Sequence, residues 1–355
     1  MTSLRISRVY RECAATLFIG FSACYSADLT TNTYRQAGAS RSAIPSSTGY
    51  DITDLGTLGG GYSSANAINP AGWIVGFSLT ADGDGHAVLW RDGEMIDLGS
   101  VGRWSEATGV SPSGTVVGYA MTAQSQARAF VWRKGAMTDI GRLGAGANIG
   151  DWSGAAGINP AGVVVGQSST NDDFARAFLW RDGTMLDLGT LGGRGSSATA
   201  INAAGEVVGQ SDTQDGIEAF IWKKGKMTGL GTLGGVGSHA TAVANGYVVG
   251  TATLESGVHH AFLWHDGVMR DLGTLGGLNS DAFGVSAAGW VVGTSEFESG
   301  FHVPHAFLWR DGQMIDLGTL PGGLSSRATA ISPSGHIVGS SLSPDGQRAV
   351  LWVPK

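Results

Sequence analysis

Cysteine is almost absent from this chain of 355 residues, which contains only Cys13 and Cys24, both near the N-terminus. The remaining sequence therefore has no disulfide and no zinc–thiolate site. Charged residues amount to only 14%, and no apolar run reaches the ~20 residues that span a bilayer. Residues 1–48 hold five arginines and two acids, so the rest carries 17 basic and 27 acidic residues. Such an acidic body repels phosphate backbones, and we expect no nucleic-acid partner and no transmembrane span.

Several catalytic and cofactor motifs are also missing. The sequence has no Gly-x-Ser-x-Gly nucleophile elbow and no Gly-Lys-Ser/Thr phosphate loop. The segment Asp82-Gly83-Asp84-Gly85 is too short for an EF-hand loop. We therefore assign no catalytic residue and expect no cofactor.

The N-terminus has the features of an export signal over residues 1–27. A basic region with Arg5, Arg8 and Arg11 precedes the largely apolar residues 13–24, which are too short to span a membrane. Two processing sites remain open. Phe21-Ser22-Ala23-Cys24 is similar to a lipobox, in which Cys24 becomes lipidated, and simple cleavage near Ala27 is the alternative.

Residues 28–48 are polar and aperiodic, and predict a flexible linker. We expect a secreted protein, extracellular or periplasmic. Lipidation of Cys24 would make it an outer-membrane-anchored lipoprotein.

Glycine is abundant, with 58 residues, and short motifs recur from residue 49 onward. A Leu-Gly or Ile-Gly segment and a Val-Val-Gly or Ile-Val-Gly segment each occur seven times. An apolar segment that ends in Trp recurs at intervals of about 42 to 48 residues, at Trp90, Trp132, Trp180, Trp222, Trp264, Trp309 and Trp352. A period of ~42 residues built from short strands is typical of β-propeller blades.

Each repeat predicts four antiparallel strands, a to d, as in residues 63–68, 73–78, 87–91 and 94–98. Asp92-Gly93 between strands c and d suits a two-residue type I′ turn, in which both residues have positive φ.

The two ends of the repeat region suggest how it closes. A lone d-type strand over 51–55 comes first, and the last repeat stops after strand c, over 349–352. An open array would expose strand edges, whereas in a ring the N-terminal strand completes the last blade. We predict an all-β fold, a seven-bladed β-propeller over 49–355 closed in this way. An open solenoid is the alternative.

The motif His-Ala-Phe-Leu-Trp at 260–264 and 305–309, with Asp-Leu-Gly-Thr-Leu-Gly-Gly at 271–277, resembles the HAF family of bacterial extracellular repeats. The similarity covers residues 50–352. The motif's His is replaced in other copies by Arg128, Arg176, Glu218 and Arg348. The resemblance implies export and carries over no activity and no catalytic residue.

Two aligned series have structural interpretations. A Ser on strand a, followed two residues later by Ala, occurs in every repeat, and such small side chains let blades converge at an axis. The serines are Ser63, Ser105, Ser153, Ser196, Ser238, Ser280 and Ser326. The strand-d Asp, present six times, predicts a side-chain-to-backbone hydrogen bond.

Loop lengths indicate where a ligand would bind. The d–a and b–c loops vary in length and should emerge on one common face, where binding specificity is expected. The residues after the aligned serines should surround the mouth of the central channel: Ser64, Glu106, Gly154, Ser197, His239, Asp281 and Arg327. Tyr62, Trp104 and Trp152 precede three of the serines. Candidate ligand-binding residues are therefore Tyr62, Trp104, Trp152, Glu106, His239, Asp281 and Arg327.

Each candidate has a structural alternative. The three aromatics could stack on a sugar or apolar partner, or pack against their blade. We expect no metal site. The histidines that could contribute to one are His239, His259, His260, His302 and His305. His260 and His305 occupy the repeat position that His86 and Arg128 take elsewhere, so His259 and His302 are the candidates that we retain. Glu106 and Asp281 could form a carboxylate pair for hydrolysis, or be solvated loop charges.

We therefore expect an exported binding or interaction module for an extracellular protein or glycan. A propeller hydrolase or lyase that acts on an extracellular polysaccharide is the second hypothesis.

Overall fold

Short strands joined by tight turns make up the described chain. The computed structural model describes residues 49–144, 151–172, 174–297 and 303–355, so the expected signal peptide, the linker and His302 lie outside these residues. Within them every regular element is a β-strand, as the sequence predicts. In the same ranges no helix is long and apolar enough to cross a membrane. The described residues belong to one compact unit.

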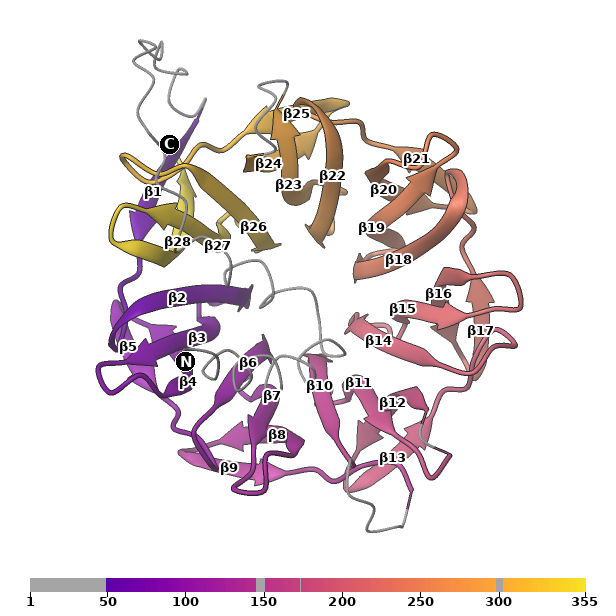
Figure 1. The fold of residues 1–355 in the computed structure, drawn as a ribbon, viewed down its shortest axis with the longest axis horizontal. Coiled ribbons are helices and arrows are strands. Elements are labelled where there is room, and N and C mark those ends of the chain that lie inside the picture. Colours follow the sequence, from indigo (N-terminus) through magenta and orange to yellow (C-terminus); the bar gives the residue numbers. More distant parts are fainter. Residues whose placement is uncertain (1–48, 145–150, 173, 298–302) are drawn as a thin grey trace, which may run out of the picture. The chain divides into compact units, whose positions relative to one another are not determined.

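The described strands group into antiparallel meanders of four, which we number repeats 1 to 7 (Figure 1). Repeats 1 and 2 comprise β2 (Gly59–Ile68), β3 (Ile74–Thr80), β4 (Gly85–Arg91), β5 (Glu94–Asp97), and β6 (Ser105–Val110), β7 (Val116–Met121), β8 (Ala127–Arg133), β9 (Ala136–Asp139). Repeats 3 and 4 comprise β10 (Ser153–Ile158), β11 (Val164–Ser169), β12 (Ala175–Arg181), β13 (Thr184–Asp187), and β14 (Ser196–Ile201), β15 (Val207–Asp212), β16 (Ile217–Lys223), β17 (Lys226–Gly229). Repeats 5 and 6 comprise β18 (Gly234–Ala244), β19 (Tyr247–Leu254), β20 (His259–His265), β21 (Val268–Asp271), and β22 (Gly276–Val285), β23 (Val291–Phe297), β24 (Pro304–Arg310), β25 (Gln313–Asp316). Repeat 7 comprises β26 (Ser325–Ile331), β27 (Ile337–Ser343), β28 (Gly346–Pro354) and, from the other end of the chain, β1 (Tyr50–Asp54).

Strand β1 pairs antiparallel with β28 along its full length, from Tyr50 opposite Pro354 to Asp54 opposite Val350. It therefore has the same place beside β28 that β5 has beside β4. One parallel bridge, between Tyr62 and Gln347, also joins repeat 1 to repeat 7. The two ends of the repeat region thus contribute to the same sheet.

The c–d turns have the predicted type I′ geometry. Asp92 and Gly93 have φ values of 55° and 83°, and the later Asp-Gly pairs repeat this geometry. Lys134 and Lys224 adopt the same positive φ in two other copies. These two-residue turns keep strands c and d in fixed register.

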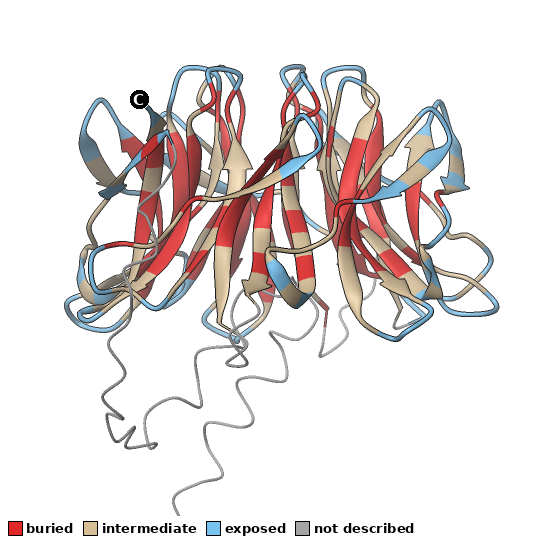
Figure 2. Ribbon diagram, turned by 90° about the horizontal axis from the view of Figure 1, so that it is seen from above, coloured by how far each residue is buried: buried red, intermediate tan, exposed pale blue. Residues whose placement is uncertain are grey.

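The apolar core lies between adjacent repeats. One buried cluster joins Val75 and Leu89 of repeat 1 to Val116 and Phe130 of repeat 2. An equivalent cluster joins repeat 7 to repeat 1 and contains Val338 together with buried residues of β2 to β4. Buried residues run along the middle of the strands, and the turns are exposed (Figure 2). Each sheet is therefore stabilised chiefly by its neighbours, because it buries its faces against them.

The aligned serines link adjacent repeats by hydrogen bonds. Ser105, for example, donates to the Gly99 carbonyl at 2.6 Å and accepts from the Ala87 amide of repeat 1 at 2.8 Å. All seven serines are buried and make both bonds. Ser63 makes them across the two ends of the repeat region, with the Ala349 amide at 2.9 Å. From the sequence we attributed the serine in each repeat to its small size. Its two hydrogen bonds give a second reason for a serine at this position.

A second set of links lies three residues further along strand a. Thr108, Thr199, Thr241 and Thr329 each donate to an alanine carbonyl of the next repeat, at 2.7 to 2.9 Å. Asn66 does the same in repeat 1. Repeats 3 and 6 carry Ala156 and Phe283 here, which have no side-chain donor. We call this position the staple position.

Candidate functional site

The residues predicted to surround the channel mouth follow the linking serines on the innermost strands (Figure 1). We call this set the inner ring: Ser64, Glu106, Gly154, Ser197, His239, Asp281 and Arg327. In every repeat a β-bulge follows directly on strand a, for example between Ala282 and Gly284. A bulge changes the direction in which nearby side chains point, so it helps to orient the inner ring.

The strand-b glycine has a steric role at this bulge. A Cβ on Gly293 would lie 1.9 Å from the carbonyl oxygen of Asp281, a contact that no side chain can make. The residue after this glycine pairs directly with the inner ring residue. These partners form a second row, which the sequence analysis did not identify: Phe77, Tyr119, Gln167, Gln210, Thr251, Thr294 and Ser340. Their position directly after the glycine that all repeats share could have identified them in the sequence.

Asp281 lies in a cluster of polar groups from repeats 5 and 6. Its Oδ1 accepts from Thr251 Oγ1 at 2.8 Å, and its Oδ2 lies 3.7 Å from His259 Nε2. Burial opposes ionisation of Asp281, but His259 and Thr251 outweigh it and hold its pKa below the ordinary value. The interaction with Asp281 correspondingly raises the pKa of His259. Burial lowers the pKa of the nearby His239.

Glu106 is held by side chains of repeats 1 and 2. The Tyr119 hydroxyl donates to Oε2 at 2.5 Å, and Asn66 Nδ2 donates to Oε1 at 2.9 Å. Burial raises the pKa of Glu106 although these hydrogen bonds oppose the shift. Both carboxylate oxygens are therefore occupied. The partners of Glu106 come from repeats 1 and 2, and those of Asp281 come from repeats 5 and 6.

Arg327 differs from the other charged members of the inner ring. Its guanidinium carbon lies 3.7 Å from the centre of the Phe283 ring. Its Nε is buried and has no hydrogen-bond partner among the described residues. Burial lowers the pKa of Arg327, and Asp281 and Tyr62 oppose that shift. The residue as a whole is only half-buried.

Two of the three predicted aromatics belong to one cluster. Phe77 stacks on Trp104 with ring centres 4.5 Å apart, and Tyr62 meets Phe77 edge-on at 5.7 Å. The hydroxyl of Tyr62 accepts from Gln347, and burial together with Glu106 raises the pKa of Tyr62 to about 12. Trp104 is 36% exposed. Phe77, which no motif singled out, is the residue that brings Tyr62 and Trp104 together.

Trp152 and the metal candidates are not part of this aromatic cluster. Trp152 is half-buried, and its backbone is bonded to Ser168 and Ser169 of its own repeat. His259 is paired with Asp281, and His302 lies outside the described residues. The part of the chain that the structure describes contains no group of three or more His, Cys, Asp or Glu side chains able to hold a metal ion.

The strand-d Asp series forms the predicted side-chain-to-backbone bonds. Asp97 Oδ1 accepts the Gly99 amide at 2.8 Å, and His86 Nδ1 of strand c lies 2.9 Å away from the same carboxylate. The equivalent Asp residues accept a glycine amide in the same way: Asp54, Asp139, Asp187, Asp271 and Asp316. The motif's His and its Arg replacements mostly face this Asp.

Repeat 4 achieves the same bond by a different route. It has Gly229 in place of Asp, and Glu218 in place of the His or Arg. Glu218 Oε1 accepts the Gly231 amide at 2.7 Å. A Cβ on Gly229 would lie 2.3 Å from that oxygen, so the glycine provides the space for the carboxylate.

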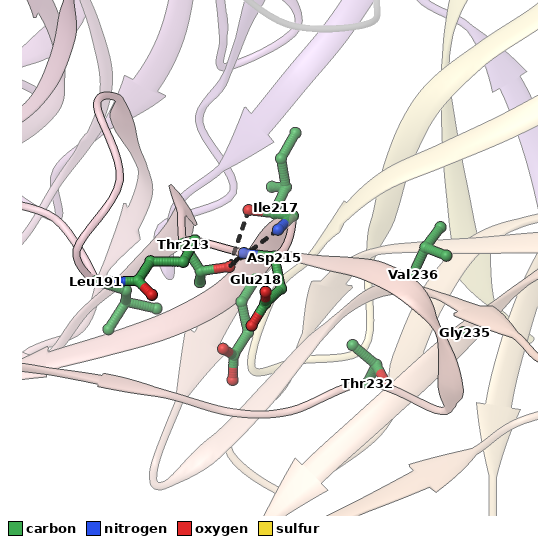
Figure 3. A pocket seen from close by; sticks show the side chains of 10 residues that line it. Leu191, Thr213, Asp215, Ile217, Glu218, Thr232, Gly235 and Val236 are labelled. Atoms are coloured by element: carbon green, nitrogen blue, oxygen red, sulfur yellow. Dashed lines mark hydrogen bonds between the residues drawn. The ribbon is translucent and has the colours of Figure 1, made fainter.

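A cavity of about 530 Å³ lies between the d–a and b–c loops around repeats 4 and 5 (Figure 3). Its lining residues are Leu191, Thr213, Gln214, Asp215, Gly216, Ile217, Glu218, Thr232, Gly235 and Val236. Val236 is 85% exposed, and the charged members of the lining are both acids. The cavity contains no inner ring residue, and its charge disfavours anionic ligands. The sequence analysis did not identify it.

Comparisons with known proteins define the class of fold. No family model and no curated protein matches this chain. The crystal structure of puromycin hydrolase matches with a TM-score of 0.60 and 14% identity, over 87% of this chain and 55% of the other. A Mycobacterium tuberculosis puromycin-hydrolyzing peptidase matches with a TM-score of 0.55 and 13% identity, over 84% and 52%. This chain thus spans little more than half the length of these two proteins.

The β-propeller domain of the Trilobed protease from Pyrococcus furiosus matches with a TM-score of 0.57 and 12% identity, over 83% of this chain and 94% of the domain. That domain has an open velcro topology, whereas β1 pairs with β28 here. At such identities the similarity concerns the fold alone. The chain has an all-β, β-propeller fold.

Proposed function

We propose that this chain is an exported, seven-bladed β-propeller of the HAF type. In this proposal the seven repeats are its blades, and β1 closes the ring by completing the last one. The pairing of β1 with β28 and the Ser63 link to Ala349 support this closure. The basic and apolar N-terminal pattern supports export.

The propeller acts as a binding module for an extracellular protein or glycan, through the face that carries the d–a and b–c loops. One contrast carries this proposal. The serine links and strand-b glycines are the same in every repeat, whereas the inner ring residue differs in nearly every repeat. Structural needs that repeat seven times do not require this variation. Recognition of a single ligand near the axis of a pseudo-symmetric ring requires different side chains in different repeats.

Binding to a panel of extracellular polysaccharides and proteins, measured with the full chain, tests this function. Trp104→Ala should weaken binding by ~1–3 kcal/mol if Trp104 is an anchor. The matched control is Trp73→Ala, because Trp73 follows an a–b turn, at the other end of the strands. If the two variants weaken binding equally, or nothing in the panel binds, the proposal fails.

A hydrolase or lyase is the second candidate, because Tyr119 and Asn66 hold the Glu106 carboxyl in the inner ring and burial raises its pKa. A raised pKa favours the protonated form that a general acid needs. Turnover of a polysaccharide that is lost in Glu106→Gln would establish this activity. Turnover that survives the substitution would exclude Glu106 as the acid.

A further inference from the structure

The half-buried Arg327 side chain makes no hydrogen bond to the described residues. Its Nε is buried without a partner, and its two Nη atoms are not buried. Asp281 interacts electrostatically with Arg327, but its carboxylate is already bonded to Thr251 and faces His259. Burying the Nε donor unpaired costs free energy, and the two Nη atoms are free to bind an anion.

The side chain that lies against the guanidinium also departs from the pattern of the other repeats. Phe283 occupies the staple position, where four other repeats have a threonine that bonds to the next repeat. In repeat 6 that link is absent, and the centre of the Phe283 ring lies 3.7 Å from the guanidinium carbon of Arg327. Repeat 3 also lacks the link, but it has the small Ala156 there and no ring. Departures from a shared pattern are expected at functional sites. Stacking on Phe283 holds the plane of the guanidinium and leaves the donors at its edge available.

We propose that Arg327 binds the carboxylate of an acidic saccharide. This inference rests on the proposed binding function and specifies its ligand. A guanidinium matches a carboxylate through two parallel hydrogen bonds. Asp281 and Tyr62 interact electrostatically with Arg327, and the remaining lone pairs of their oxygens can accept hydrogen bonds from sugar hydroxyls. Tyr62 contacts Phe77, which stacks on Trp104, and the partly exposed Trp104 offers an aromatic surface to the apolar face of a sugar.

The test measures binding of trigalacturonic acid and of its fully methyl-esterified form by calorimetry. The two differ in charge and share their ring hydroxyls. We expect the acid to bind at least about tenfold more tightly than the ester. Arg327→Met should weaken binding of the acid by about 10- to 100-fold, as for loss of a charge-assisted pair. Arg327→Lys should recover only part of it, because lysine keeps the charge but not the fork.

Two further variants separate the site from the fold. Phe283→Thr introduces the residue that four other repeats use, so the propeller should fold while acid binding weakens at least about fivefold through loss of the stacking surface. Arg194→Met is the matched control, because Arg194 of a d–a loop also lies over a phenylalanine, Phe174 of the b–c loop in repeat 3. It should leave binding of the acid within about twofold of the parent.

Three results would overturn the proposal: equal binding of acid and ester, equal effects of Arg327→Met and Arg194→Met, or binding of triglutamate with none of trigalacturonate. If the ester binds and Trp104→Ala weakens that binding, the binding function stands and only the assignment of Arg327 fails. If neither saccharide binds, the assignment fails as well, and the wider ligand panel decides the binding function.

Discussion

The link between repeats 7 and 1 allows a direct test of ring closure. Ser63 and Ser196 make equivalent pairs of hydrogen bonds, Ser63 across the two ends of the repeat region and Ser196 between interior repeats. Both are buried. If the ring is closed in solution, Ser63→Ala and Ser196→Ala should reduce the free energy of unfolding by similar amounts.

The expected size follows from the groups left behind. Ser63→Ala removes the acceptor of the Ala349 amide, at 2.9 Å, and the donor to the Gly56 carbonyl, at 2.7 Å. An unsatisfied buried polar group costs about 1–3 kcal/mol, so two groups cost roughly 2–6 kcal/mol. At about 2 °C per kcal/mol for a chain of this size, the melting temperature should fall by roughly 4–12 °C.

Thermal unfolding followed by circular dichroism measures this effect. Ser334→Ala, at an exposed a–b turn, controls for loss of a serine hydroxyl and should melt within about 1 °C of the parent. If Ser63→Ala melts like the parent while Ser196→Ala melts several degrees lower, the closing link does not form in solution. The ring would then be open in solution.

Three further predictions concern other parts of the chain. Gly229→Asp should destabilise repeat 4, because its Cβ would overlap the Glu218 carboxylate. Adding Glu218→His should restore an Asp–His pair, with a coupling of ~1–3 kcal/mol in a double-mutant cycle of unfolding. Additive effects of the two substitutions would contradict this explanation. The pKa of His259 should lie above its ordinary value in an NMR titration and should fall in Asp281→Asn. Because the folded pKa is raised, the stabilisation is complete below the unfolded pKa and is lost as pH rises through the folded one. An unshifted His259 would argue against the pair. Cys24→Ala should move the protein from the membrane fraction to the soluble fraction if Cys24 is lipidated; an unchanged distribution would favour cleavage near Ala27.

Much of the local structure could be predicted from the sequence, because the information repeats. Seven copies of each motif average out the ambiguity of a single short strand. The Asp92-Gly93 turn and the bond from the strand-d Asp to a glycine amide both involve residues within a few positions of one another. Local conformational preferences alone therefore determine them.

The arrangement of the candidate site was harder to predict from the sequence. The inner ring positions could be recognised, but Phe77 joins Tyr62 to Trp104 only because strands from two repeats lie side by side. Likewise Glu218 replaces an Asp that would come from another strand, and only the spatial structure shows that its carboxylate reaches the same amide.

The amino-acid sequence by itself determined the strand class, the repeat period and the places where each repeat departs from the others. Only the tertiary structure decided what those departures contact, since Arg327 and Phe283 lie about one repeat apart in the chain and meet face to face. Their meeting depends on the angle between adjacent sheets. That angle is set by the packing of buried residues from both repeats, such as Val292 and Val350 of one shared cluster, and no local pattern encodes it.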